Sequence, residues 1–166
     1  MSLGRLAGKL GKFTLLLALV TLLTLFVPQL LGMKCYSVVS GSMTPSLPVG
    51  SAVYISGNSP EQIQEGEIIT YCTDQGKTMI THRVVENNRE KQVFITKGDA
   101  NNSLDPRPVK WENLQGRVVL CIPFAGYVLQ FLGSRNGKLA AALFLLAGYL
   151  ATEIFEGKTK KECEKN

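Results

Sequence analysis

Hydropathy divides the chain into two long apolar runs and a middle part where short apolar stretches alternate with polar ones. The first run, residues 13–33, has 21 residues and no charge, and the second, residues 139–155, has 17 residues. An α-helix rises about 1.5 Å per residue, and a hydrocarbon core is about 30 Å thick. We predict a transmembrane anchor at 13–33 and a second transmembrane helix at 139–155. For the second run, the alternative is a hairpin with the preceding apolar segment, lying in the membrane interface.

A cleaved signal peptide is the alternative interpretation of the first run. Such a signal has a shorter apolar core, followed by small residues at the cleavage site. The segment LLGMKC has Leu31 and Met33 where those small residues would stand. We therefore expect the anchor to be retained, with Pro28 tolerated near its far end.

Basic residues beside the two runs predict their orientation. Arg5, Lys9 and Lys12 precede the first run, and a lysine-rich tail follows the second. Positive charges are retained on the cytoplasmic side of a membrane. We expect residues 1–12 and the tail 156–166 to be cytoplasmic, and the chain from residue 34 onward to lie outside.

The middle of the chain predicts a mainly β fold. Its strand candidates are rich in Val, Ile, Thr and Tyr and are bounded by turn residues. They are SAVYISG (51–57), GEIITYCT (66–73), KTMITHRVV (77–85), KQVFITKGD (91–99) and LQGRVVLCI (114–122), with a hairpin loop at ENNREKQ (86–92). We predict a small extracytoplasmic β module at 34–121. An interfacial segment at 122–138 follows, in which the aromatic residues have helical spacing.

The distribution of charge argues against a nucleic-acid partner. The formal net charge is +5 and the pI is near 9.1, values that alone would favour a nucleic-acid binder. Between Lys34 and Leu120, however, nine basic residues are matched by nine acidic ones. A neutral middle with basic ends is typical of a membrane protein. We expect the lipid bilayer, and no nucleic acid, as a partner.

Cysteine and histidine spacing gives no indication of a metal site. The four cysteines are too far apart in sequence for paired zinc ligands, and there is one histidine. We expect no metal and no cofactor. Cys163 should be cytoplasmic, so at most one disulfide could join two of Cys35, Cys72 and Cys121. Buried free thiols are the alternative.

Four residues of the β module are candidates for hydrolytic chemistry. Ser42 stands in SGSMTPSL, His82 in THRVV, and Asp99 and Asp105 in TKGDANNSLDP. A serine nucleophile needs a base within reach, a group that orients the base, and donors for the oxyanion. Taken singly, the serine and the aspartates fit ordinary turns, and the histidine fits a buried strand position.

These three motifs in this order, after one apolar anchor, strongly resemble the type I signal peptidase family. The resemblance covers nearly the whole chain and is most specific at residues 36–120. It implies the family's β fold and the cleavage of signal peptides from exported proteins at the outer membrane face. Ser42 corresponds to the family's nucleophile. His82 stands where the ordinary bacterial branch has a lysine base, which resembles the branch of the endoplasmic reticulum, archaea and some Gram-positive bacteria.

The resemblance also implies roles for the two aspartates. One of them orients His82 and the other supports the site. We favour Asp105 as the orienting residue, since Pro106 restricts it to extended conformations. We expect the Ser42 N–H and the Ser40 hydroxyl to be the oxyanion donors, and Gly41 to permit a tight turn beside the nucleophile.

The predicted function is that of a membrane-bound serine endopeptidase acting on the signal peptides of preproteins, in association with the secretion machinery. We expect it in the plasma membrane of a bacterium or archaeon, with the endoplasmic reticulum membrane as the alternative. The competing hypothesis is a membrane-anchored β module that binds exported or pilus proteins without cutting them. Hydrogen-bond reach between Ser42 and His82 discriminates between the two functions.

Overall fold

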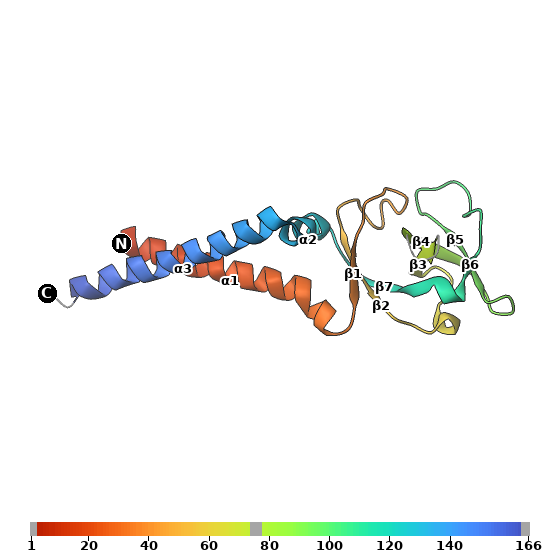
Figure 1. Ribbon diagram of the computed structural model, residues 1–166, viewed down its shortest axis with the longest axis horizontal. Helices are drawn as coiled ribbons and strands as arrows, with labels where there is room; N and C mark the ends of the chain where they lie inside the picture. The colour runs from red at the N-terminus through yellow and green to blue at the C-terminus, as the bar shows by residue number, and fades with distance from the viewer. Residues whose placement is uncertain (1–2, 74–77, 164–166) are drawn as a thin grey trace. The chain divides into compact units, whose positions relative to one another are not determined.

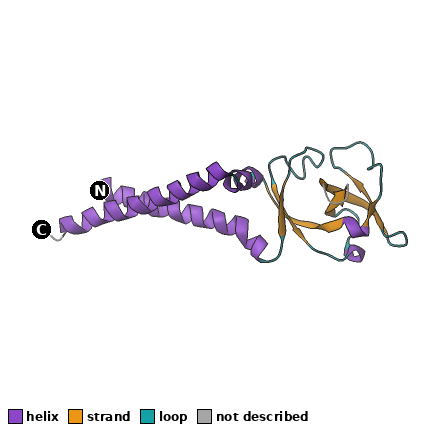
Figure 2. Ribbon diagram, viewed as in Figure 1, coloured by secondary structure: helices purple, strands orange, loops and turns teal. Residues whose placement is uncertain are grey.

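The computed structural model describes residues 3–73 and 78–163 and divides the chain into two units. We call Met1–Val27 with Phe131–Asn166 the helical unit, and Pro28–Gln130 the β unit. Every strand belongs to the β unit (Figure 2), so the chain is mainly β outside its long helices, as predicted.

The helical unit holds most of two long helices, α1 (Leu3–Leu30) and α3 (Arg135–Cys163) (Figure 1). Gly148 of α3 lies against α1, because a methyl group on its Cα would be 3.1 Å from the Leu15 side chain. Small residues permit such close packing between apolar helices. The predicted second span, 139–155, is helical within α3, and its crossing of a membrane stays a prediction.

Among the described residues, α1 is the one helix long and apolar enough to cross a membrane. The qualifying part is Gly8–Leu30, with a mean hydropathy of 2.2 and only 11% of its residues buried. The helix continues through Pro28 and ends at Leu30, before Gly32 turns the chain with a φ of +85°. The helix therefore ends before Met33, the last residue of the predicted anchor. Its insertion in a bilayer stays a prediction.

The β unit is built on one antiparallel sheet in the strand order β1-β2-β7-β3-β4-β5-β6. The strands are β1 (Lys34–Ser37), β2 (Ala52–Ser56), β3 (Ile68–Thr73), β4 (Thr78–Asn88), β5 (Val93–Lys97), β6 (Val109–Lys110) and β7 (Leu114–Ile122). Two short 3-10 helices, η1 (Pro60–Gln62) and η3 (Trp111–Asn113), and the helix α2 (Ala125–Gly133) complete the described elements. α2 coincides with the helical spacing predicted within 122–138.

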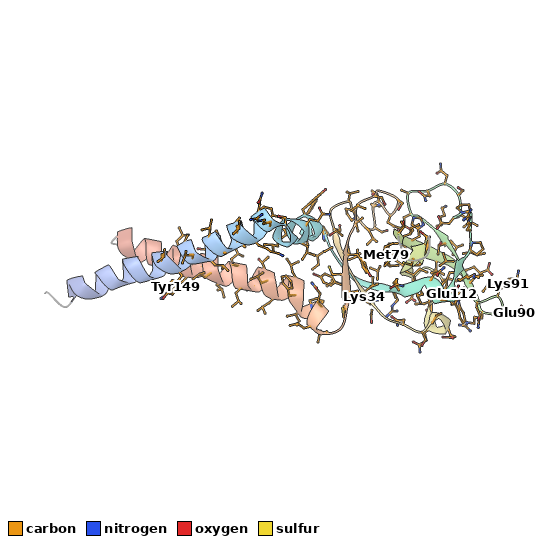
Figure 3. All side chains as sticks on the ribbon, in the orientation of Figure 1. Lys34, Met79, Glu90, Lys91, Glu112 and Tyr149 are labelled. Atoms are coloured by element: carbon orange, nitrogen blue, oxygen red, sulfur yellow. The ribbon has the colours of Figure 1, made fainter. Side chains whose placement is uncertain are left out.

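Each of the five predicted strands has a counterpart, but one boundary was wrong. β4 extends to Asn88, so the hairpin loop predicted at 86–92 shortens to a turn at 89–92, where Figure 3 labels Glu90 and Lys91. The cause is Asn87, whose side-chain amide donates to two backbone carbonyls and accepts from the Trp111 indole. These bonds satisfy a polar residue that alone predicts a loop. Lys77, the first residue of the third predicted strand, lies outside the described residues.

Two hydrophobic clusters hold the sheet together. Ile69, Tyr71, Val84 and Phe94 are the centre of the first cluster, on β3, β4 and β5. The second cluster consists of Met43, Leu47 and Val53, packed against partly buried side chains of β1, β3 and β7. It fastens the segment between β1 and β2 to the sheet, and this segment carries Ser42.

Gly116 permits a close approach of backbones inside the sheet. It lies in β7, where the pairing with β3 shifts register, and its φ is +153°. A Cβ at this position would lie 2.4 Å from the Ser56 carbonyl oxygen of β2, too close for any side chain.

Candidate active site

Ser42 stands on the turn that follows β1 and is fixed by its neighbour. Met43 is 2% exposed and inserts into the second cluster, and Leu47 anchors the other end of the same turn. Ser42 itself is half-buried. Because Met43 anchors the backbone of the turn, the Ser42 hydroxyl is left free to bond His82 and Ser40.

Gly98, rather than Gly41, is the glycine that the geometry at Ser42 requires. The expected tight turn is present, since the Thr44 N–H donates to the Gly41 carbonyl at 3.0 Å. It does not require a glycine, because Gly41 has no left-handed φ and a Cβ there would meet only the Thr44 hydroxyl at 3.6 Å. A Cβ on Gly98 would lie 2.7 Å from the Ser42 carbonyl oxygen. The Ala100 N–H donates to that carbonyl at 2.9 Å, which ties the segment after β5 to the nucleophile turn.

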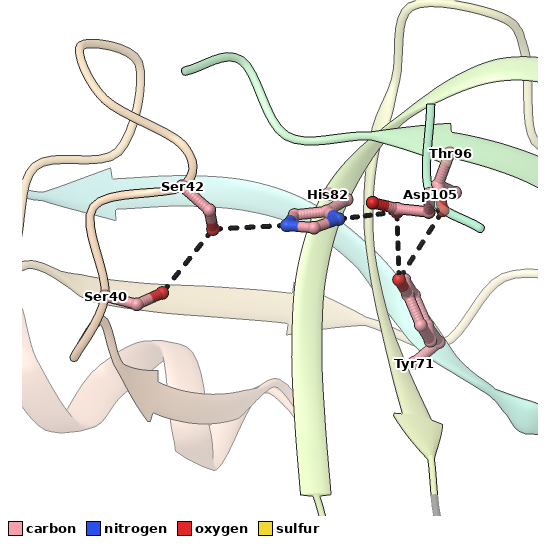
Figure 4. Close-up of polar contacts among 6 residues, drawn as sticks. All are labelled: Ser40, Ser42, Tyr71, His82, Thr96 and Asp105. Atoms are coloured by element: carbon pink, nitrogen blue, oxygen red, sulfur yellow. Dashed lines mark hydrogen bonds and ion pairs between the residues drawn. The ribbon is translucent and has the colours of Figure 1, made fainter. Parts of the chain in front are cut away.

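His82 lies on the buried face of β4 and bridges two of the predicted site residues. It is 7% exposed. Its Nε2 is 3.1 Å from the Ser42 Oγ, and its Nδ1 is 2.6 Å from the Asp105 Oδ2 (Figure 4). These contacts form one hydrogen-bonded chain from serine through histidine to carboxylate.

Asp105 receives further hydrogen bonds from strands on either side of His82. Its backbone N–H donates to the Thr96 carbonyl oxygen at 2.9 Å. The Thr96 hydroxyl donates to the Asp105 Oδ2 at 2.6 Å, and the Tyr71 hydroxyl donates to the same oxygen at 3.2 Å. Burial raises the pKa of Tyr71 to about 12, and the negative charge of Asp105 acts in the same direction. Tyr71 therefore remains protonated, and a donor, throughout the neutral range.

Asp99 makes no hydrogen bond to His82 and interacts with it only electrostatically. It forms a paired contact with Arg83, whose Nε and terminal nitrogen lie 2.8 Å and 2.6 Å from its two oxygens. The same guanidinium donates to the Gly66 carbonyl and to the Ser46 hydroxyl, so it links β4 to the nucleophile turn. The hydrogen bonds from Arg83 lower the pKa of Asp99, and burial only partly opposes them.

Ser40 and Ser42, the residues of the two predicted oxyanion donors, line the same cavity. The Ser40 Oγ is 3.4 Å from the Ser42 Oγ (Figure 4). The backbone N–H of Ser42 has no acceptor within the part of the chain that the structure describes. A cavity of about 240 Å³ opens beside Ser40 and Ser42. It is lined by Val38, Met43, Leu47, Ile80 and other residues of β4 and of the segment between β1 and β2. The cavity is large enough for a small side chain.

A metal has no evident place in this site. In residues 3–73 and 78–163, no group of three or more His, Cys, Asp or Glu side chains is arranged to hold an ion. The three cysteines of the β unit, Cys35, Cys72 and Cys121, are free thiols.

Four residues important to the geometry were not predicted: Tyr71, Arg83, Thr96 and Gly98. Arg83 and Thr96 lie within the THRVV and TKGDANNSLDP motifs, but nothing in the sequence shows what they bond. Tyr71 lies outside the motifs, and only the pairing of β3 with β4 brings it beside them. Gly98 precedes Asp99 in the TKGD motif. Its direct contact with Ser42 gives a structural reason for a glycine there.

Comparison with known proteins gives several similar chains. Signal peptidase I W of Bacillus subtilis is 32% identical over 117 residues, which cover 63% of this chain and 61% of that protein. The signal peptidase complex catalytic subunit SEC11 of Candida albicans is 35% identical over 102 residues, 55% of this chain and 60% of the relative. The SEC11 subunit of Ogataea parapolymorpha is 30% identical over 135 residues, 69% of this chain and 75% of the relative.

No protein-family model matches the chain. The chain spans about three fifths of the Bacillus and Candida relatives and three quarters of the Ogataea one. With this identity over most of a relative's length, the chain belongs to the type I signal peptidase family.

Proposed function

We propose that this protein is a membrane-anchored serine endopeptidase that removes N-terminal signal peptides from exported proteins. The hydrogen-bonded chain from Ser42 through His82 to Asp105 carries the proposal. The names of the relatives, signal peptidase I and signal peptidase catalytic subunit, support the choice of substrate.

In the first half of the reaction, the Ser42 Oγ attacks the carbonyl carbon of the scissile bond. His82 accepts the hydroxyl proton at Nε2, which already lies 3.1 Å from that oxygen. An imidazole suits this step because its charge changes close to neutral pH. Asp105 accepts from Nδ1–H, which fixes the tautomer that leaves Nε2 free to take a proton.

The negative charge then develops on the former carbonyl oxygen. The Ser42 N–H and the Ser40 hydroxyl stabilise this oxyanion by donating hydrogen bonds to it. When the tetrahedral intermediate collapses, the carbon–nitrogen bond breaks and His82 returns its proton to the leaving amine. Water, deprotonated by His82, hydrolyses the acyl-enzyme in the second half and regenerates Ser42.

The edge of β4 offers a binding track for an extended substrate. β4 pairs with β5 only from Arg83 onward, so residues 78–82 pair on one side only, with β3, among the described strands. A peptide that added a strand there would run past Ser42 and would place one side chain in the cavity beside it. The small volume of this cavity favours small residues just before the cut.

The apolar helix α1 anchors the enzyme where its substrates emerge. It is long enough to span, and its side chains from Leu10 to Leu30 are largely exposed. Signal peptides reach their cleavage site at the membrane surface, so a tethered enzyme meets them at a high effective concentration. We place the β unit on the outer face of a plasma membrane, with the endoplasmic reticulum as the alternative location. Association with the secretion machinery is part of the same proposal.

The proposal is tested by incubating the purified full-length protein in detergent with a preprotein and sequencing the new N-terminus. We expect one cut after a small residue, and no cut by Ser42→Ala. A Ser134→Ala control, changed at a serine outside the site, should cleave normally. If wild type binds the preprotein but Ser42→Ala and wild type both leave it intact, the non-cleaving binding module is the correct function.

A further inference from the structure

His82 is flanked by hydroxyl groups from both neighbouring strands. His82 lies on β4 and is opposite Ile69 on β3, two residues before Tyr71. On the other side, Thr96 of β5 is opposite Val84, two residues after His82 on β4. Tyr71 and Thr96 therefore occupy diagonal positions on the same face as His82. The Tyr71 ring meets the imidazole edge-on, with centroids 6.5 Å apart.

Both hydroxyls end on the carboxylate oxygen that His82 uses. The Asp105 Oδ2 accepts from the His82 Nδ1, from Thr96 at 2.6 Å and from Tyr71 at 3.2 Å (Figure 4). Both donors are buried, Thr96 at 1% and Tyr71 at 4% exposure, whereas the Asp105 side chain is 15% exposed. Orientation of His82 needs only one acceptor, and the two extra donors call for another explanation.

We propose that Tyr71 and Thr96 are positioning residues that share the negative charge of Asp105 and so limit how strongly this carboxylate stabilises a protonated His82. This inference rests on the proposed peptidase function. A carboxylate stabilises a protonated imidazole beside it. Each hydroxyl that donates to the carboxylate takes part of that charge and weakens the stabilisation. Without the two donors, Asp105 would stabilise the protonated imidazole more strongly, and the neutral form that accepts the Ser42 proton would be less favoured.

Other titratable groups near His82 have different partners. Asp99 on the adjacent turn is paired with Arg83. The cavity shared by His82 and Asp105 is also lined by Cys72 and Arg107. Neither of these two makes a hydrogen bond to His82 or to the Asp105 carboxylate among the described residues. Tyr71 and Thr96 are therefore the side chains through which the charge of Asp105 can be changed while its contact with His82 is kept.

The single histidine of this chain makes a direct test practical. The full-length protein, purified without a histidine tag and labelled with ¹⁵N-histidine, gives ring resonances that belong to His82 alone. Their titration midpoint is measured for wild type, Tyr71→Phe and Thr96→Val. We expect each variant to raise the midpoint by about half a pH unit, a fraction of the effect of a full neighbouring charge.

Matched controls separate charge sharing from packing. Thr96→Ser keeps the donor and loses the methyl group, so its midpoint should stay at the wild-type value. Thr70→Val removes another buried hydroxyl of β3, one that bonds Thr81 rather than Asp105. Tyr54→Phe removes a buried phenol that interacts with Cys35. Both should leave the midpoint unchanged, and melting curves confirm that each variant is folded.

The pH dependence of preprotein cleavage supplies a second readout. A midpoint shift of half a unit lowers kcat/KM about threefold on the acid side and leaves the alkaline plateau unchanged. A purely structural role would lower the rate at every pH. The inference is overturned if the midpoints of folded Tyr71→Phe and Thr96→Val stay fixed or fall, or if the control variants shift equally. Because the titration needs no substrate, a failure of the proposed function would appear separately, as absent cleavage by wild type.

Discussion

Replacing Asp99 by asparagine tests whether the two aspartates of the motif have separate functions. The substitution keeps the shape of the side chain and removes the charge that pairs with Arg83. Asp99 is 15% exposed and Arg83 is 35% exposed. Hydrogen bonds to charged groups contribute about 1.5–3 kcal/mol, but solvent screening at the exposed Arg83 reduces this. We expect the free energy of unfolding to fall by about 1–2 kcal/mol.

The loss of stability should depend on pH in a defined direction. The hydrogen bonds from Arg83 lower the pKa of Asp99 in the folded protein. A lowered carboxylate pKa contributes stability above the unfolded value of about 3.9, and the contribution disappears as the pH falls through the folded value. The difference in the free energy of unfolding between wild type and Asp99→Asn should therefore be largest near neutral pH and should shrink below about pH 4.

Thermal unfolding of the full-length protein in detergent, followed by circular dichroism, measures this effect. For a unit of about 100 residues, we expect a Tm lower by roughly 5–10 °C. Cleavage by the folded variant should stay within about tenfold of wild type, because Asp99 does not touch His82. Glu67→Gln is a matched control, since Glu67 also pairs with an arginine, Arg117, and should lower the Tm without affecting cleavage. A stable but inactive Asp99→Asn would refute this division of roles.

Three further predictions concern the site and the topology. Asp105→Asn should fold normally and lose activity by a factor on the order of 10⁴, because the His82 tautomer is no longer fixed; a cleavage rate within tenfold of wild type would contradict this. His82→Lys should retain less than about a tenth of the wild-type cleavage rate, because lysine acts as a base only where burial lowers its pKa. Single-turnover cleavage of a preprotein measures this rate. Topology is tested with single cysteines in a background without native cysteines. A cysteine at Glu90 should be labelled from outside intact cells, whereas cysteines at Ser2 and Asn166, both outside the described residues, should not be labelled. Labelling at Asn166 alone would mean that 139–155 does not span the membrane.

The sequence predicted much of the sheet because its strands are short, apolar and separated by clear turn residues. It failed where tertiary contacts override a local signal. Asn87 belongs to a polar run that predicts a loop, yet its amide is satisfied by backbone carbonyls near η1, so β4 continues. β1 and β6 are too short to produce an alternating pattern of their own.

The site was predictable only as far as its motifs. Ser42, His82 and Asp105 each lie in a recognisable segment, and the structure brings the three together. Tyr71 belongs to no motif, and Thr96 begins TKGDANNSLDP, but in the sequence each has the character of an ordinary strand residue. Their relation to Asp105 depends on which strands pair and in which register, and a single sequence does not contain that information directly.

The arrangement of the strands explains how one buried polar chain can exist beside a hydrophobic core. Burying a carboxylate is costly unless its oxygens are hydrogen-bonded. β3 and β5 supply the hydroxyls that bond the Asp105 Oδ2, and the same strands contribute Ile69 and Phe94 to the first cluster. Loss of either hydroxyl therefore removes a hydrogen bond to the Asp105 carboxylate and leaves Ile69 and Phe94 in place. The site and the core share strands and one side chain, Tyr71, whose ring packs in the first cluster while its hydroxyl donates to Asp105.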